Sequence, residues 1–141
     1  MKYDKFYMDV AKRIAQESYA TRLKVGSAIL TENGGLFVGF NGTLSKFPNV
    51  CENEDGTTNE YITIHSEENA LYKMLKEGVS AKGATIYISH SPCARCSRML
   101  IASGIKRVVY CEPYRDDTPL KILEHAGVEV QKYGETLTNS E

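Results

Sequence analysis

The 141-residue sequence predicts an α/β fold built around a mixed β-sheet. An early pair of apolar segments joined by a tight turn predicts two antiparallel strands. A later alternation of strand-like and helix-like segments predicts parallel strands with right-handed crossovers. The length, and the lack of a linker, repeat or low-complexity tract, predict a single domain over 1–141, with a core at about 4–133 and a polar tail at 134–141.

The N-terminal segment predicts an amphipathic helix from residue 4 to about residue 18. Phe6, Val10 and Ile14 recur at a spacing of four residues, which places them on one apolar face. Asp4 stands at the start of the segment, where its carboxylate is expected to cap the free N–H groups of the helix.

Two short apolar segments, 25–30 and 36–41, predict the strands of a hairpin. The turn between them contains Asn33-Gly34-Gly35, a strong signal for a tight connection. A long polar stretch follows from residue 42 to about residue 61. Loops of this length within compact domains are usually functional or disordered.

The second half of the chain alternates helices and strands. Helices are expected at 66–77, 93–103 and 118–126, and strands at 85–89, 107–111 and 128–130. A glycine follows each of these helices and is expected to end it. The inner face of the first helix is expected to carry Ala70, Leu71, Met74 and Leu75.

Composition excludes several classes of protein. Seventeen basic against 18 acidic residues give a net charge of −1, so the basic footprint of a protein that binds polymeric nucleic acid is missing. No apolar run approaches the roughly 18–20 residues of a membrane span. The N-terminal segment also lacks the apolar core and cleavage site of a signal peptide. We therefore expect a cytoplasmic protein with neither a membrane nor a nucleic-acid polymer as partner.

Three potential metal ligands lie at the expected starts of two helices. His65 precedes one helix, and Cys93 and Cys96 open the next one, directly after Pro92. A close cysteine pair in a cytosolic chain indicates metal or redox chemistry. One nitrogen and two thiolates would leave the fourth position of a tetrahedral zinc ion free for water, as in catalytic zinc sites.

Glu67 lies two residues after His65, where it can face a zinc-bound water without being a ligand. Zinc lowers the pKa of its water toward neutrality, and a neighbouring carboxylate can take the proton and pass it on. His-x-Glu followed by Pro-Cys-x-x-Cys is the pattern of the zinc deaminases, which replace the amino group of a nucleobase with oxygen. The alternative is that His65 caps a helix beside buried or redox-active thiols.

These motifs make the chain resemble the cytidine/deoxycytidylate deaminase superfamily, and within it the deoxycytidylate deaminases. The resemblance covers nearly all of 4–133. Its landmarks are Val25-Gly26, Gly39-Phe40-Asn41-Gly42, His65-Ser66-Glu67, Ser91-Pro92-Cys93-Ala94-Arg95-Cys96 and Glu112-Pro113-Tyr114-Arg115. It implies a three-layer, cytidine-deaminase-like fold with a five-stranded mixed sheet in the order 2-1-3-4-5 and helices on both faces.

The resemblance also implies hydrolysis of dCMP to dUMP and ammonia, a step that supplies the precursor of dTTP. Hydroxide formed at one catalytic Zn²⁺ per chain, bound by His65, Cys93 and Cys96, would attack C4 of cytosine while Glu67 shuttles protons. Members of the family form homo-oligomers, with a hexamer favoured here. They are activated by dCTP, which Mg²⁺ would accompany, and inhibited by dTTP.

Substrate contacts are expected from residues that match the family or flank the pocket. Asn41 matches a substrate-contacting Asn, although Asn41-Gly42 is alternatively a plain turn. Tyr114 would contact the nucleotide, or alternatively pack at a strand end. Ser66 stands where the family commonly has Ala and is a further candidate contact. Candidates for a phosphate or an effector site are the basic residues Arg22, Lys24 and Arg115.

Departures from the family concern the long loop. Leu44 replaces a frequent Pro, and Cys51 lacks the cysteine neighbour that a second, structural zinc would need, so no second zinc is expected.

The remaining cysteine and a histidine near the metal motif are expected to have structural roles. Cys111 is expected in the core, and His90 is expected to be structural rather than a ligand.

Two rival functions stay open. A tRNA adenosine deaminase, or another nucleobase or nucleoside deaminase, would use the same chemistry, although the near-zero charge disfavours tRNA. A structural zinc-binding or inactive regulatory module would need no carboxylate at Glu67.

Overall fold

The computed structural model describes residues 1–134, so the tail expected at 134–141 lies outside the described residues from residue 135 onward. Its helices are α1 (Asp4–Ala15), α2 (Ser66–Glu77), α3 (Ala94–Ala102) and α4 (Thr118–His125). Its strands are β1 (Gly26–Leu30), β2 (Leu36–Phe40), β3 (Gly42–Thr43), β4 (Thr63–Ile64), β5 (Thr85–His90), β6 (Arg107–Glu112) and β7 (Glu129–Lys132).

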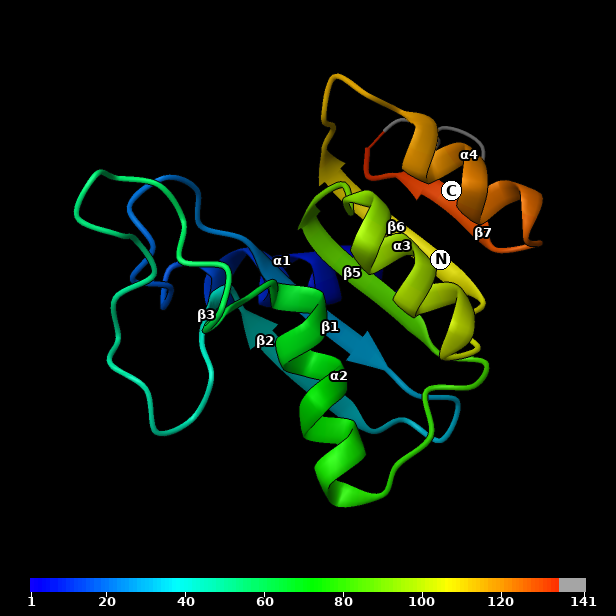
Figure 1. The fold of residues 1–141 in the computed structure, drawn as a ribbon. Helices are drawn as coiled ribbons and strands as arrows, with labels where there is room; N and C mark the ends of the chain where they lie inside the picture. The colour runs from blue at the N-terminus through cyan, green and yellow to red at the C-terminus, as the bar shows by residue number, and fades with distance from the viewer. Residues whose placement is uncertain (135–141) are drawn as a thin grey trace.

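The main sheet has five strands in the order β2-β1-β5-β6-β7 (Figure 1). β1 pairs antiparallel with both β2 and β5, whereas β5, β6 and β7 run parallel. Counted along the chain, these five strands have the order 2-1-3-4-5, so the expected fold class is confirmed. β3 and β4 form a separate two-stranded ladder that the sequence did not predict.

Helices cover both faces of this sheet. α1 lies behind it in Figure 1, and α2, α3 and α4 lie in front. Successive residues of β5 show the division, because side chains alternate between the faces of a strand. Ile86 and Ile88 enter the core beneath the three front helices, whereas Tyr87 packs with Met8 and Ala11 of α1.

Two glycines allow helices to approach the sheet closely. A Cβ atom on Gly39 would lie 2.5 Å from the nitrogen of Ala70 and 2.6 Å from the carbonyl oxygen of Ser66, both in α2. A Cβ atom on Gly26 would likewise collide with the backbone of α1 at Ala11. The glycine in β2 therefore sets how closely the first turn of α2 sits on the sheet.

α1 differs from the expectation in its end and its buried face. It ends at Ala15 rather than near residue 18, and its core side chains are Met8, Ala11 and Ala15. Phe6, expected on the buried face, is 58% exposed. The expectation was wrong because the face that packs on the sheet consists of Asp4, Met8, Ala11 and Ala15, and apolar periodicity does not identify a face that includes a buried aspartate.

Asp4 is not a helix cap. The capping position is Tyr3, and the Asp4 side chain is buried against Arg107 in β6. The two guanidinium Nη atoms of Arg107 donate to the two Asp4 oxygens at 2.8 and 2.7 Å. The hydroxyl of Tyr87 donates to Asp4 at 2.8 Å. This buried ion pair links the N-terminus to the centre of the sheet.

The remaining elements lie within a few residues of their expected bounds. α2 spans 66–77 as predicted, but Leu75, expected on its inner face, is 75% exposed. His125 is exposed, and Cys111 is half-buried beside the α1 cluster rather than fully in the core. Among the described residues, no helix has both the length and the apolar character needed to cross a membrane.

Candidate active site

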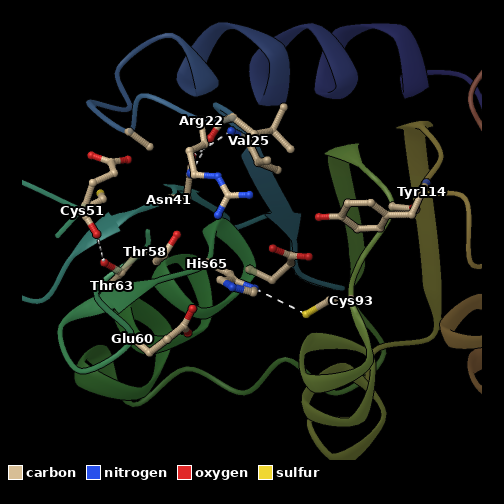
Figure 2. A pocket seen from close by; sticks show the side chains of 15 residues that line it. Arg22, Val25, Asn41, Cys51, Thr58, Glu60, Thr63, His65, Cys93 and Tyr114 are labelled. Carbon is tan, nitrogen blue, oxygen red and sulfur yellow. Dashed lines mark hydrogen bonds between the residues drawn. The ribbon is translucent and has the colours of Figure 1, made fainter. Parts of the chain in front are cut away.

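The candidate site lies at one edge of the main sheet, where several strand ends meet. β1 runs opposite to β5, so the start of β1 lies at the same edge as the ends of β2, β5 and β6. Arg22 therefore comes near Asn41, Cys93 and Tyr114 although these residues are far apart in the sequence (Figure 2). This is the edge at which α/β proteins bind their ligands.

Three side chains at this edge have the composition and spacing of a zinc site. The Nδ1 atom of His65 lies 3.4 Å from Sγ of Cys93 and 3.3 Å from Sγ of Cys96. The three potential ligand atoms lie within 4.8 Å of one another. Zinc bonded tetrahedrally to one nitrogen and two sulfurs needs separations of about 3.6 Å between such atoms. The residues therefore fit zinc, with the fourth position left for water.

Two helix starts carry these residues. His65 and Cys93 are the N-capping residues of α2 and α3, and both have extended backbones. The extended conformation places each side chain at the positive end of its helix, which favours negatively charged ligands such as thiolates. Cys96 lies one turn into α3 and is fully buried.

The cysteine pair is electrostatically asymmetric. Hydrogen bonds from Cys96 and then from His65 lower the pKa of the Cys93 thiol to about 3, against the opposing effect of burial. The pKa of Cys96 is raised, first by its hydrogen bond to Cys93 and then by burial. The hydrogen bond to Cys93 raises the pKa of His65. Metal binding releases the remaining protons, because zinc takes thiolates and a neutral imidazole.

Glu67 lines the same cavity and is only 4% exposed. One carboxylate oxygen accepts a hydrogen bond of 3.0 Å from the hydroxyl of Ser66. Burial raises the pKa of Glu67 above its ordinary value. A shift in this direction makes the carboxylate a better proton acceptor than an ordinary glutamate.

The cavity measures about 330 Å³, the low end of the range for small-molecule sites. Figure 2 shows His65 and Cys93 on one side and the Tyr114 hydroxyl directed inward. The lining residues are Ala20, Arg22, Leu23, Val25, Asn41, Cys51, Glu52, Thr58, Glu60, Thr63, His65, Glu67, Ser91, Cys93 and Tyr114.

Asn41 lines the cavity and also holds its wall together. Its side-chain oxygen accepts a hydrogen bond from the backbone N–H of Val25 at 2.8 Å, and its amide donates to the carbonyl of Leu23 at 2.7 Å. Residues 23–25, which follow Arg22, are thereby fixed. Asn41 is thus more than the residue of a plain turn.

The other predicted candidates divide between the cavity and its surroundings. Arg22 and Tyr114 line the cavity, whereas Lys24 and Arg115 are not among its lining residues. Ser66 is fully buried, and its hydroxyl shares a hydrogen bond of 2.6 Å with Ser27. Ser66 therefore supports Glu67 from behind and does not face a ligand.

The sequence indicated a functional loop between β3 and β4 but did not identify which of its residues line the cavity. This loop supplies Cys51, Glu52, Thr58 and Glu60 to the wall. The loop is tied back to the chain, since Glu52 accepts a hydrogen bond from the N–H of Thr21 at 2.9 Å. Its length and polarity were the only signals in the sequence, and they do not identify individual contacts.

His90 packs beside the pocket. Its ring lies 4.5 Å from that of Tyr114, centroid to centroid. It does not belong to the group of potential metal ligands found among the described residues, in line with its expected structural role.

Comparisons with known proteins agree with this geometry. Residues 1–112 match the family model of the cytidine and deoxycytidylate deaminase zinc-binding region. The ComE operon protein 2 of Bacillus subtilis is 31% identical over 92% of this chain and 70% of its own length. A deoxycytidylate deaminase of Saccharomyces cerevisiae is 33% identical over 95% of this chain, which spans about half (46%) of that protein.

A solved structure is also similar over nearly the full described chain. The dCMP deaminase of cyanophage S-TIM5, in complex with dCMP and dUMP, superposes with a TM-score of 0.86 and 41% identity. The match covers 93% of this chain and 96% of the phage chain. The family match over residues 1–112 includes all three potential ligands and Glu67. The chain therefore belongs to the cytidine and deoxycytidylate deaminase family.

Proposed function

We propose that the protein is a zinc-dependent dCMP deaminase that converts dCMP and water into dUMP and ammonia. One observation carries the proposal: a buried carboxylate, Glu67, lines the same cavity as the ligand group of His65 and Cys93. The similarity to a phage enzyme that binds dCMP and dUMP supports this choice of substrate.

We assign one Zn²⁺ per chain to His65, Cys93 and Cys96. When bound, zinc supplies a Lewis acid that lowers the pKa of a water molecule toward neutrality. The three residues leave one position free, which distinguishes a catalytic site from a closed structural one.

Glu67 moves the protons of the reaction. It takes a proton from the attacking water as the new C4–O bond forms, and it protonates N3 of the cytosine ring. Glu67 then passes the proton of the new C4 hydroxyl to the amino group, so that the C4=O bond forms, the C4–N bond breaks and ammonia leaves. Burial favours this role, because a raised pKa lets Glu67 carry a proton between these steps.

Residues of the cavity wall orient the nucleotide. Arg22 brings a positive charge to the wall, and we assign it to the 5′-phosphate. Tyr114 directs its hydroxyl toward the cavity from the opposite side and bounds the base (Figure 2). Asn41 keeps the segment after Arg22 in place through both polar atoms of its amide, and we assign its second amide N–H to the sugar. Lys24 and Arg115, outside the lining, are assigned to an effector site.

The proposal extends to assembly and control. On the basis of the family resemblance, the chain is a single cytoplasmic domain that forms a homo-oligomer, with a hexamer favoured. It is activated by dCTP together with Mg²⁺ and inhibited by dTTP. Sedimentation velocity and dCMP kinetics with each triphosphate test these points separately from the chemistry.

A substrate panel tests the proposed activity. Zinc-loaded protein is incubated with dCMP, CMP, deoxycytidine, dCTP and adenosine-containing RNA, and ammonia release is measured. We expect release from dCMP at the highest kcat/KM. Deamination of the RNA alone would instead establish a tRNA-type deaminase. Zinc binding without deamination of any compound would establish a structural or regulatory module.

A further inference from the structure

Glu68 forms a hydrogen-bonded junction directly behind the candidate zinc site. It follows Glu67 in α2, but its carboxylate is directed elsewhere, and the residue is only 8% exposed. One carboxylate oxygen accepts a hydrogen bond from the backbone N–H of His65 at 2.7 Å. The same oxygen accepts another from the guanidinium of Arg95 at 3.0 Å. The second oxygen accepts one from the hydroxyl of Tyr72 at 3.3 Å.

Arg95 lies between the two cysteines, in the first turn of α3. Its ion pair with Glu68 therefore joins the start of α3, which carries both cysteines, to the start of α2, which carries His65. The two halves of the ligand set come from separate segments, so their spacing depends on contacts that bridge these helix starts. The Glu68–Arg95 pair is such a bridge.

We propose that Glu68 and Arg95 are positioning residues that clamp the two helix starts and so slow the loss of zinc. The proposal rests on the zinc site assigned above and adds residues that do not touch the metal. Contacts behind metal ligands typically alter metal affinity by about 10–100-fold when removed. The ion pair also places a positive charge beside two thiolates, which offsets part of their negative charge.

The burial of the carboxylate makes this pair different from ordinary surface ion pairs. The side chain of Glu68 is 10% exposed, so its charge is only weakly solvated and depends on Arg95. Arg95 also lies 3.9 Å from Glu60 in the long loop, but the Glu60 side chain is 69% exposed. An exposed pair at that distance contributes little. Glu68 is therefore the main partner of Arg95.

The test is the rate at which zinc is released to an excess of a chromogenic chelator. Glu68→Gln keeps an oxygen for the N–H of His65 but removes the charge that holds Arg95. Arg95→Met removes the guanidinium and keeps much of its aliphatic stem. We expect both variants to release zinc about tenfold faster than wild type or more. We expect Arg98→Ala, which removes an exposed arginine of the same helix, to release it at the wild-type rate.

Two further variants separate a clamp from a general structural role. The double variant Glu68→Gln/Arg95→Met is expected to release zinc no faster than the faster single variant, because both substitutions break one pair. Arg95→Lys, which keeps the charge, is expected to recover part of the retention. Far-UV circular dichroism identifies any variant that fails to fold. If Arg95→Met does not fold, the clamp is tested by the other two variants: zinc release about tenfold faster in Glu68→Gln, and a smaller acceleration in Arg95→Lys.

The zinc content of the wild-type protein and the release rates of the variants test the zinc site and the clamp separately. A wild-type protein that binds no zinc would contradict the zinc site itself. A wild-type protein that binds one zinc, with all folded variants releasing it at the same rate, would overturn the clamp alone. Additive acceleration in the double variant would also overturn it, because the two residues would then act separately.

Discussion

Replacing Asp4 with Asn is expected to lower the free energy of unfolding by about 3 kcal/mol. Removing one partner of a buried ion pair costs about 3–5 kcal/mol, because the other charge stays buried without compensation. The Asp4 and Arg107 side chains are each only 3% exposed. The lower end of the range applies here, since Arg107 also donates to Glu129 at 3.1 Å and to Gln131 at 2.6 Å.

Thermal unfolding followed by circular dichroism measures this effect. For a chain of this length, 1 kcal/mol corresponds to about 4 °C in Tm, so the variant should unfold about 12 °C below wild type. Both proteins are compared with zinc in saturating excess. The control is Asp9→Asn, which breaks an exposed pair with Lys5 on the same helix and should change stability by less than about 0.5 kcal/mol.

The pH dependence gives a second check on the same pair. Burial alone would raise the pKa of Asp4, but hydrogen bonds from Arg107, the N-terminus and Tyr87 outweigh it and hold the pKa well below its ordinary value. The pKa of an aspartate in the unfolded chain is about 3.9. Because the pKa of Asp4 is lower in the folded protein, the ionised carboxylate stabilises the fold at pH values above about 3.9. This stabilisation is lost as the pH falls toward the pKa of the folded protein. The difference between wild type and Asp4→Asn should therefore be constant from about pH 5 to 8 and shrink below about pH 4. A Tm for Asp4→Asn equal to that of Asp9→Asn would refute the reasoning.

Two further predictions concern the cavity and its frame. Gly39→Ala places a Cβ atom 2.5 Å from the nitrogen of Ala70, so the first turn of α2 must shift. We expect a lower Tm and less bound zinc in this variant. A Tm and a zinc content equal to those of wild type would contradict the close approach of α2 to Gly39. Arg22→Gln removes the charge assigned to the 5′-phosphate; we expect KM for dCMP to rise by about 10–100-fold. Turnover of deoxycytidine, which has no phosphate, should be unchanged, and an equal loss on both substrates would remove Arg22 from that role.

The hairpin, the parallel strands and the ligand group could be predicted because their signals are local, whereas the order of the main sheet was implied by the family resemblance. A turn sequence defines the hairpin, alternation defines the parallel strands, and the spacing from Cys93 to Cys96 places both on one helix turn. His65 could be joined to that pair because it stands at the expected start of the preceding helix and begins the His-x-Glu motif. The structure then brought the three side chains within reach of one metal ion.

The sequence-based predictions were wrong or incomplete where contacts between distant segments determine the position of a side chain. Asp4 looked like a cap because its partner Arg107 lies 103 residues away, and no local pattern connects the two. Phe6 looked buried because periodicity reports apolar character, whereas the face of α1 that packs on the sheet includes the buried Asp4. The Glu68–Arg95 pair escaped notice for the same reason as Asp4, since it depends on how two helix starts meet in space.

The role of Glu67 as proton carrier is tested by the turnover of dCMP in Glu67→Gln at wild-type zinc content. Gln keeps the size of the side chain but cannot carry a proton, and Glu67 is not one of the three potential ligands. We expect one zinc per chain in both proteins and a kcat reduced by about 10²–10⁴-fold in the variant. Turnover near the wild-type rate at equal zinc content would contradict the assignment of Glu67 as the group that moves the protons.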